Sequence, residues 1–344
     1  MRKLIPAAVL VVALALLASG CGSKKQAATT VAAPTTTAAA SGFRVGLVTD
    51  LGGLNDRGFN HLAYVGLQKA STDFGVATRV VQSVSPADYV PNLSKLAKQG
   101  YNLVIGVGFT EIQAMATVAK QFPKTHFAIV DVSNADEGKL KNVEGLLFRE
   151  QQVGYLAGYA SGLAAKARGG TTVSTVGGEK QPPVDRYIAG YQAGAKAAFP
   201  AVKLINGYSQ DFSIEAKCKE VALNQIASGS VVVFQVAGGC GLGALDAAKG
   251  AGVWGVGVDA DQNYLGPYML TSAVKKVDFA VYATIQKLTQ GTFLGGQTTT
   301  FGIKNFAAGI SGYAKSVPPP VKTKVNAIIA KIKAGGIKIP NTVK

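Results

Sequence analysis

The chain has 344 residues, of which 48% are hydrophobic and 16% are charged, so it can bury a large core. Its formal net charge of +16 is compatible with a nucleic-acid-binding protein, but the lysines are scattered and no basic motif interspersed with aromatic residues is present. We therefore expect a globular protein with a solvated positive surface and no nucleic-acid partner.

The first residues predict a targeting segment. An apolar run over residues 4–17 follows a positively charged start, and it is shorter than the roughly 20 residues that span a bilayer. This pattern predicts a secretory signal peptide over residues 1–20. The small residues directly before Cys21 resemble a bacterial lipobox, in which the cysteine is lipidated and becomes the mature N-terminus. The alternative is a plain secretory signal with an incidental cysteine.

A segment without core-forming residues follows. Residues 21–42 are rich in Ala and Thr and show no apolar period, so they predict a flexible tether. A chain of that length spans roughly 25 Å. We expect lipid on Cys21 to anchor the protein at the extracytoplasmic face of the cell membrane, since no later stretch is long and apolar enough for a second span.

From residue 43 onward, short β-rich runs alternate with helical patterns, which is typical of a parallel α/β fold. Strands are expected over 43–49, 77–81, 103–107, 126–130, 143–148, 171–177, 202–208, 231–236 and 253–258, followed by the segment 268–272. Helices are expected over 60–74, 88–99, 110–121, 151–166, 184–199, 214–228, 242–251, 277–290 and 319–333.

The two consecutive strand–helix series have similar size, and they predict two Rossmann-like lobes with a ligand cleft between them. The first lobe is expected to contain residues 43–150 and roughly 262–296, and the second residues 151–261 and roughly 297–344. Ligands in such sheets bind beyond the carboxyl ends of the strands. The residues at the strand ends are therefore the candidates for function.

The end of the first strand is one such place. Asp50 is followed by a loop, residues 51–60, which is rich in glycine and polar side chains and leads into a helix with Phe59 at its mouth. Glycine allows close backbone approach, and a helix N-terminus offers free N–H donors. The combination favours a ligand contact over a purely structural loop, although Phe59 alone is equally well explained as a core residue.

Cys218 and Cys240 are the cysteines that remain after Cys21. An exported protein meets oxidising conditions, so we expect a disulfide between them, with two buried free thiols as the alternative. Two cysteines without a nearby histidine make a poor ligand set, and His61 and His126 lie in different expected elements. We expect no metal site.

Several motifs together resemble the basic membrane protein family, which includes the PnrA-like purine-nucleoside receptors. The resemblance begins with Val48-Thr49-Asp50 and Asn55-Asp56-Arg57-Gly58-Phe59-Asn60, and covers nearly the whole mature domain. It continues in Phe127-Ala128-Ile129-Val130-Asp131, Gln152-Val153-Gly154-Tyr155-Leu156-Ala157-Gly158, Gly255-Val256-Gly257-Val258-Asp259-Ala260-Asp261-Gln262 and Leu270-Thr271-Ser272.

The resemblance implies a type I periplasmic-binding-protein fold and the substrate-binding lipoprotein of an ABC transporter. Such a protein captures a small molecule, here a purine or other nucleoside, and works with a membrane permease. The resemblance further implies a monomer that has no cofactor and is not an enzyme.

The resemblance also implies ligand roles for single residues. Phe59 and Phe212 are similar to the two aromatic residues that sandwich the nucleobase, and Asp259 is similar to the carboxylate that accepts hydrogen bonds from ribose hydroxyls. The other implied ligand residues are Asp50, Asn60, Asp131, Gly238 and Lys275.

The sequence departs from the family pattern at two places. Cys218 stands where a Gly, Lys or Ala is usual, which supports a local disulfide with Cys240. Arg57 and Gly58 stand where Lys-Ser is commoner, which bears on fine specificity and not on the fold.

Other functions remain open from the sequence. The run Gly239-Cys240-Gly241-Leu242-Gly243-Ala244 matches a dinucleotide fingerprint, and Asp259 follows at the usual spacing, but export is an odd setting for a nicotinamide enzyme. A nucleoside hydrolase using Asp50 and Asp259 is a second alternative. A sensory lipoprotein, or a receptor for riboflavin or a sugar, is a third.

Overall fold

The computed structural model describes residues 42–343. The predicted signal peptide, the predicted lipidation at Cys21 and the tether up to residue 41 lie outside the described residues. Within the described part, no helix is long and apolar enough to cross a membrane.

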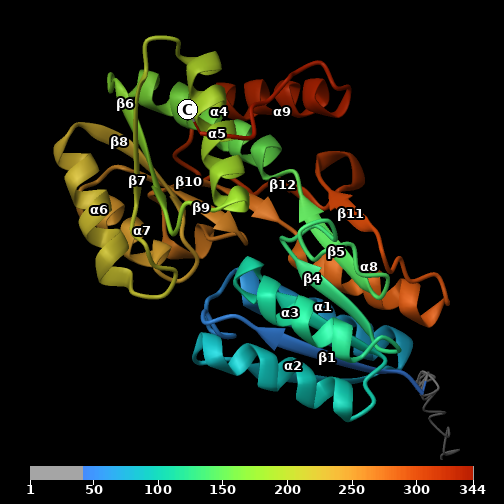
Figure 1. Cartoon of the computed structure of the whole chain (residues 1–344). Coiled ribbons are helices and arrows are strands. Elements are labelled where there is room, and N and C mark those ends of the chain that lie inside the picture. Colours follow the sequence, from blue (N-terminus) through green and yellow to red (C-terminus); the bar gives the residue numbers. More distant parts are fainter. Residues whose placement is uncertain (1–41, 344) are drawn as a thin grey trace, which may run out of the picture. The chain divides into compact units, whose positions relative to one another are not determined.

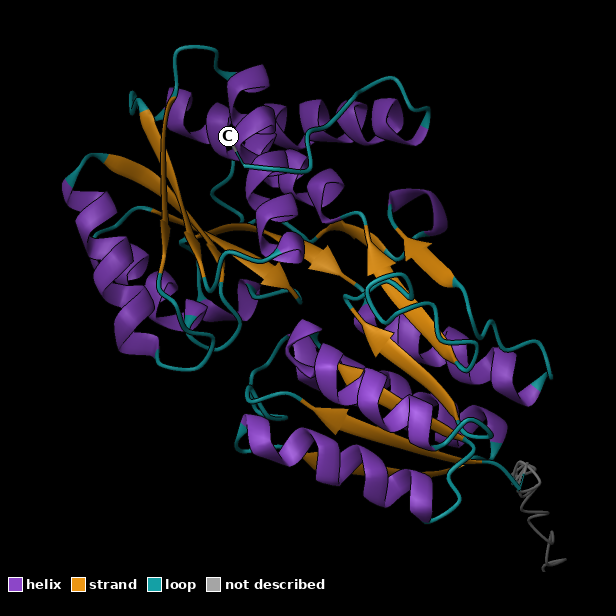
Figure 2. Ribbon diagram, viewed as in Figure 1, coloured by secondary structure: helices purple, strands orange, loops and turns teal. Residues whose placement is uncertain are grey.

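Two six-stranded sheets form the cores of two lobes (Figures 1 and 2). The first sheet has the order β11-β5-β4-β3-β1-β2, and all its neighbouring strands run parallel. Its strands are β1 (Arg44–Thr49), β2 (Ala77–Gln82), β3 (Leu103–Val107), β4 (His126–Val130), β5 (Val143–Phe148) and β11 (Thr298–Phe301).

The second sheet has the order β12-β10-β9-β8-β6-β7, and β12 pairs antiparallel with β10 at its edge. Its other neighbouring strands pair in parallel. Its strands are β6 (Thr172–Gly177), β7 (Lys203–Tyr208), β8 (Ser230–Val236), β9 (Trp254–Asp259), β10 (Met269–Lys275) and β12 (Ala308–Ile310).

Helices cover both faces of each sheet, so the central strands of both sheets are buried. In the first lobe, α1 (Phe59–Phe74) and α8 (Val277–Thr289) enclose one core cluster, and α2 (Tyr89–Lys98) and α3 (Ile112–Gln121) enclose the other. In the second lobe, α6 (Glu215–Ala227) and α7 (Gly241–Gly250) contribute to one cluster. The larger cluster of that lobe lies under α4 (Glu150–Ala167), α5 (Pro182–Ala198) and α9 (Pro319–Lys333), which gather together in Figure 1.

The predicted alternation of strands and helices and the two Rossmann-like lobes are confirmed, but the two edge strands β11 and β12 were not expected. Both are short, at four and three residues, and too brief to show a clear period. The lobe boundaries also need correction. Strand β10 lies in the second sheet, although residues 262–296 were assigned to the first lobe, and β11 lies in the first sheet, although residues 297–344 were assigned to the second.

The chain passes between the lobes at three places, after β5, β10 and β11. These crossings are hydrogen-bonded to one another or to neighbouring segments: Arg149 N donates to Phe301 O at 2.8 Å, and Ile303 N donates to Gln152 Oε1 at 3.0 Å. Lys276 N, at the crossing after β10, donates to Ala307 O, at the crossing after β11, at 2.9 Å. The three connections therefore form one hinge region.

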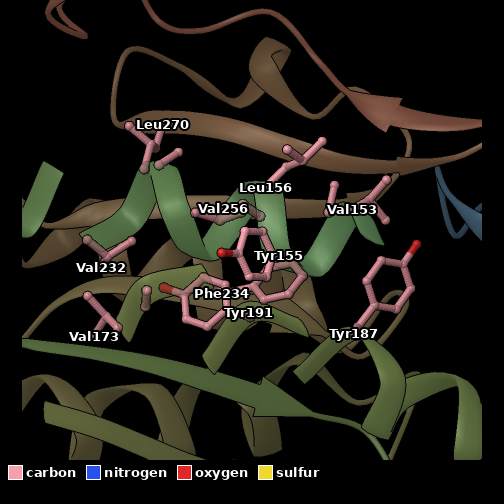
Figure 3. Close-up of a cluster of buried hydrophobic side chains, with 14 of the residues drawn as sticks. Val153, Tyr155, Leu156, Val173, Tyr187, Tyr191, Val232, Phe234, Val256 and Leu270 are labelled. Carbon is pink, nitrogen blue, oxygen red and sulfur yellow. The ribbon is translucent and has the colours of Figure 1, made fainter. Parts of the chain in front are cut away.

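Helices α4 and α5 pack closely because glycines face each other's backbone. A Cβ atom added at Gly158 would collide with the carbonyl of Tyr191, and one added at Gly194 would collide with the carbonyl of Tyr155. The Tyr191 ring stacks on Phe234 with centroids 5.0 Å apart, and Figure 3 shows Tyr187 at the edge of this cluster. The close approach of the two helices fixes Tyr187 at the start of α5.

Gly158→Ala should destabilise the protein, because the new methyl group has no space between α4 and α5. Overpacking of this kind costs about 1–3 kcal/mol of unfolding free energy, which urea denaturation would measure. Gly250→Ala is the control, since nothing lies within 4 Å of a Cβ atom at that position. It should be neutral or slightly stabilising. Equal effects of the two substitutions would contradict the close packing of α4 on α5.

Candidate ligand-binding site

A cleft of about 590 Å³, including space open to solvent, is lined by strand-end residues of both lobes. Both sheets have the same order for five strands, so each has a topological switch point, between β1 and β3 and between β6 and β8. All the ligand residues expected from the sequence line this cleft: Asp50, Phe59, Asn60, Asp131, Phe212, Gly238, Asp259 and Lys275.

The first-lobe wall is built around the N-terminus of α1. The Asp56 carboxylate accepts hydrogen bonds from the backbone N–H groups of Gly58, Asn60 and His61 at 3.0, 2.7 and 3.0 Å. It thereby takes the place of an N-cap side chain. This loop conformation presents Phe59, the first residue of α1, to the cleft.

Asp50 and Asn60 form one polar unit on that wall. Asn60 Nδ2 donates to Asp50 Oδ1 at 2.6 Å, and Gly52 N donates to the same oxygen at 3.0 Å. The other amide atom, Asn60 Oδ1, is buried and has no protein partner. Buried polar atoms rarely stay unpaired, so this acceptor is available to a ligand donor.

The second-lobe wall carries Phe212, which lies in the loop between β7 and α6. A Cβ atom at Gly178 would collide with the Phe212 ring, so glycine is needed there for the ring to approach the backbone after β6. The ring meets Phe109 of the first lobe edge-on, with centroids 5.9 Å apart. Phe212 therefore contacts both its own lobe and the opposite one.

Lys275, at the end of β10, links the two lobes at the floor of the cleft. Its Nζ lies 2.8 Å from Asp131 Oδ2 of the first lobe and 3.8 Å from Asp259 Oδ1 of the second. Glu150 Oε1, at the start of α4, lies 3.7 Å from the same Nζ. The ammonium is also 4.8 Å from the centre of the Phe59 ring. One buried cation thus lies near three carboxylates and an aromatic face, and Glu150 is also paired with Arg186, whose Nε donates to Glu150 Oε2 at 2.6 Å.

Two of these carboxylates occupy equivalent places in the two sheets. Asp131 follows β4 and Asp259 ends β9, the corresponding strand of the second sheet. Both have left-handed backbone conformations, with φ of 68° and 61°. Aspartate tolerates this conformation better than most residues, and backbone strain of this kind is concentrated at functional sites.

Burial dominates the electrostatics of the site. It raises the pKa of Asp259 to about 6, although Lys275 and the hydroxyl of Tyr187, which donates to Asp259 Oδ1 at 2.9 Å, oppose the shift. Burial likewise raises the pKa of Asp50 to about 6, against its hydrogen bonds from Asn60 and Gly52. Burial alone would lower the pKa of Lys275, but the surrounding carboxylates have the larger effect, so its pKa is raised.

The lining is rich in hydrogen-bond acceptors and poor in positive charge. Four aspartates line the cleft, and Lys275 is the one basic residue among its lining side chains. Asp131 Oδ1 is buried without a protein partner. Such a site can hold a neutral ligand with several hydroxyl, amino or ring N–H donors.

Sequence reasoning missed several lining residues. Phe109 follows β3 and could have been found, because ligands bind beyond the carboxyl ends of strands. Tyr187 lies inside α5, where that argument does not apply. Pro183 and Val184, also from the start of α5, complete that side. These helix residues enter the site through the close packing of α5 on α4.

The structure joins Cys218 and Cys240 in a disulfide, with Cα atoms 5.6 Å apart. The glycines of the neighbouring dinucleotide-like run contact protein atoms: a Cβ at Gly243 would collide with the Glu215 carbonyl, and one at Gly241 with Gln235 Oε1. Gly243 therefore allows α7 to pack on α6, and Gly241 leaves room for the Gln235 side chain of β8. Within residues 42–343, no group of three or more His, Cys, Asp or Glu side chains is placed to hold a metal ion.

Comparisons with known proteins agree with the resemblance seen in the sequence. The family model described as "ABC transporter substrate-binding protein PnrA-like" matches residues 43–342. The CD4+ T-cell-stimulating antigen of Listeria monocytogenes serovar 1/2a is 36% identical over 320 residues, with 87% of this chain and 88% of that protein covered. The ABC transporter nucleoside-binding protein BmpA of Lactococcus lactis subsp. cremoris is 34% identical, with 87% and 89% covered.

A solved structure supports the fold. The crystal structure of an ABC transporter solute-binding protein from Aeropyrum pernix K1 has a TM-score of 0.79 and 25% sequence identity, and the match covers 88% of this chain and 94% of that one. The expected periplasmic-binding-protein fold is confirmed.

Asp259→Asn should stabilise the ligand-free protein at pH 8. The folded-state pKa of about 6 lies above the unfolded value of 3.8, so burying this charge lowers stability above pH 6, and the loss disappears as the pH falls toward 3.8. The neutral amide removes that penalty, which is about 1–3 kcal/mol. Urea unfolding at pH 8 and pH 4 would measure the gain, which should be absent at pH 4.

Asp261→Asn is the control, because Asp261 is exposed and a surface substitution usually changes stability by less than about 0.5 kcal/mol. A loss of stability in Asp259→Asn at pH 8 would mean that the attraction of Lys275 exceeds the burial penalty.

Proposed function

The chain belongs to the PnrA-like family of ABC transporter substrate-binding proteins, and we propose that its cleft captures a nucleoside, purine nucleosides above all, for delivery to a membrane permease. The observation that carries the proposal is the pairing of an aromatic side chain from each lobe with an acceptor-rich floor. The description of the related Lactococcus lactis protein as nucleoside-binding supports the same ligand class.

Phe59 and Phe212 support the base-binding half of the proposal. They come from opposite lobes and line the same cleft, so a flat heterocycle entering it meets an aromatic residue on each wall. Stacking of a base on an aromatic side chain contributes roughly 1–3 kcal/mol. Asp50 and Asn60, beside Phe59, offer polar atoms to the edge of the base.

Asp259 and Asp131 support the ribose-binding half. Asp259 Oδ1 accepts from Tyr187 at 2.9 Å, and Asp131 Oδ2 is engaged by Lys275 at 2.8 Å, so each carboxylate keeps an oxygen for the ligand. Hydrogen bonds from hydroxyls to an ionised carboxylate are stronger than neutral ones. Vicinal ribose hydroxyls supply two such donors side by side.

The charge of the cleft argues against nucleotides. A phosphate would face four aspartates with a single lysine that is already paired with Asp131. Repulsion between like charges is strong in a buried site, where water screens little. A neutral nucleoside avoids this repulsion and keeps both the stacking and the hydroxyl contacts.

We further propose that the protein is a monomeric binding protein and not an enzyme, and that lipid on Cys21 holds it at the extracytoplasmic face of the cell membrane. A tether of roughly 20 residues would let the domain reach a permease in the same membrane. Two acyl chains on the anchor would make the attachment stable, whereas one would not.

Calorimetric titration of the mature protein with adenosine, guanosine, inosine, cytidine and uridine tests the ligand. At least one nucleoside should bind with a Kd of about 1 μM or tighter, equivalent to about 8 kcal/mol. Its 2′- and 3′-deoxy analogues should bind about tenfold or more weakly, because each loses a hydrogen bond to a charged group worth about 1.5–3 kcal/mol. The matching 5′-monophosphate should bind more weakly still.

The nucleoside proposal fails if none of the five binds below about 1 mM, a threshold near 4 kcal/mol. Free base appearing during incubation with a nucleoside would instead indicate a hydrolase. Two variants test the two halves of the ligand separately. Phe212→Ala removes the proposed stacking contact with the base, and Asp259→Asn removes the proposed charged acceptor for the ribose hydroxyls.

Replacing Cys21 by serine should abolish lipidation of the protein, because without the thiol no lipid can be attached. Mass spectrometry of the native form and the Cys21→Ser form, both isolated from cells, would measure this: the native form should carry the mass of an attached lipid and the Cys21→Ser form should not. A native form without lipid on Cys21 would contradict the proposed anchor.

A further inference from the structure

We propose that the Cys218–Cys240 disulfide is a positioning element of the binding site, which holds the Phe212 ring at its place in the cleft. The inference rests on the proposed function only in assigning Phe212 to ligand stacking. It would give these two cysteines a role in affinity in addition to any role in stability.

The segment that carries Phe212 is exposed to solvent directly after this residue. Residues 213–217 are all exposed, and the first buried residue after Phe212 is Cys218. Before Phe212, Ser209 N and Gln210 N donate to Gly177 O and Gly178 O at the end of β6, at 2.9 and 3.0 Å. Around and after Phe212 the side-chain hydrogen bonds are local: Asp211 Oδ1 accepts from Ser213 N and Ile214 N at 2.8 Å. Fixing the segment to the rest of the lobe therefore depends on the contacts at its two ends.

The partner of the bond lies in another wall of the same cleft. Cys240 is fully buried and directly follows Gly238 and Gly239, which line the site. Cys240 N donates to the carbonyl of Phe212 at 2.9 Å. The disulfide therefore clamps α6 against the residues that hold the Phe212 backbone.

The geometry around Phe212 leaves little room for movement. Gly238 has φ of 54°, and a Cβ atom there would lie 3.2 Å from the Phe212 carbonyl oxygen. Ser209 Oγ lies 3.3 Å from the Cys218 sulfur and 3.5 Å from the Cys240 sulfur, and it donates to Asp211 O at 3.0 Å. Ser209, before Phe212, therefore lies against the disulfide, and Cys218, after Phe212, is part of it.

The surrounding packing does not depend on the bond. Ala222 of α6 and Ala244 and Ala247 of α7 are buried together beside β8, so the two helices stay in contact without it. Loss of the disulfide is therefore expected to loosen the segment 209–218 and not to unfold the lobe. This separates an effect on binding from an effect on the fold.

A double-mutant cycle tests the proposal in the full mature protein. The variants are C218A/C240A, which keeps small apolar side chains in the buried cluster, F212A, and the combined triple variant. With the tightest nucleoside of the panel, C218A/C240A should weaken binding about threefold to thirtyfold, within the range of one stacking contact. In the F212A background, the same two substitutions should change the Kd by less than about twofold, because the ring they position is gone.

Val325→Ala is the matched control, because Val325 is a buried residue of α9 outside the cleft. It should lower the melting temperature and leave the nucleoside Kd unchanged. Losses of affinity that multiply in the triple variant, or an unchanged Kd in C218A/C240A, would overturn the proposal.

Amide hydrogen exchange of the ligand-free protein gives a second readout, which does not depend on nucleoside binding. C218A/C240A should exchange faster over 209–218 and 238–241, with β6 and β9 unchanged. Exchange that is unchanged, or faster throughout the lobe, would overturn the positioning role even if the wild-type protein bound no nucleoside. Failure of the nucleoside proposal and failure of this one are thereby distinguished.

Discussion

One buried ion pair joins the two lobes at the floor of the cleft. Lys275 of the second lobe lies 2.8 Å from Asp131 of the first, and Asp259 and Glu150 share the same ammonium. Burying these charges is unfavourable unless they are paired, so their positions are tightly constrained by one another. With more carboxylates than cations, the floor keeps free acceptors, and this imbalance determines which ligands can complete it.

The backbone places these groups by repeating one arrangement in both sheets. Asp131 and Asp259 end corresponding strands in the same left-handed conformation, and both face the cleft. Glycine at position 178 leaves room for the Phe212 ring beside the neighbouring strand end. The site is therefore a product of strand order and local backbone conformation, with the side chains of two lobes meeting where their switch points face each other.

Sequence patterns located part of the site at strand ends but missed Phe109, which follows β3, and the lining residues of α5. Asp50 could be found because it follows a buried β-rich run, whereas the role of Asp259 was implied by the family resemblance. Tyr187 could not be found, because it reaches the cleft only through the glycine-mediated packing of α5 on α4, which periodicity does not reveal. The same limit explains the misplaced lobe boundaries: the pattern of β10 shows that the strand is buried, but not which of the two sheets it joins.

The three chain crossings have a mechanical consequence. They are joined by hydrogen bonds, as between Arg149 N and Phe301 O at 2.8 Å, which is the arrangement expected of a hinge. A solute that contacts both walls therefore favours a smaller opening angle between the lobes. A permease that contacts each lobe can release the solute by increasing that angle.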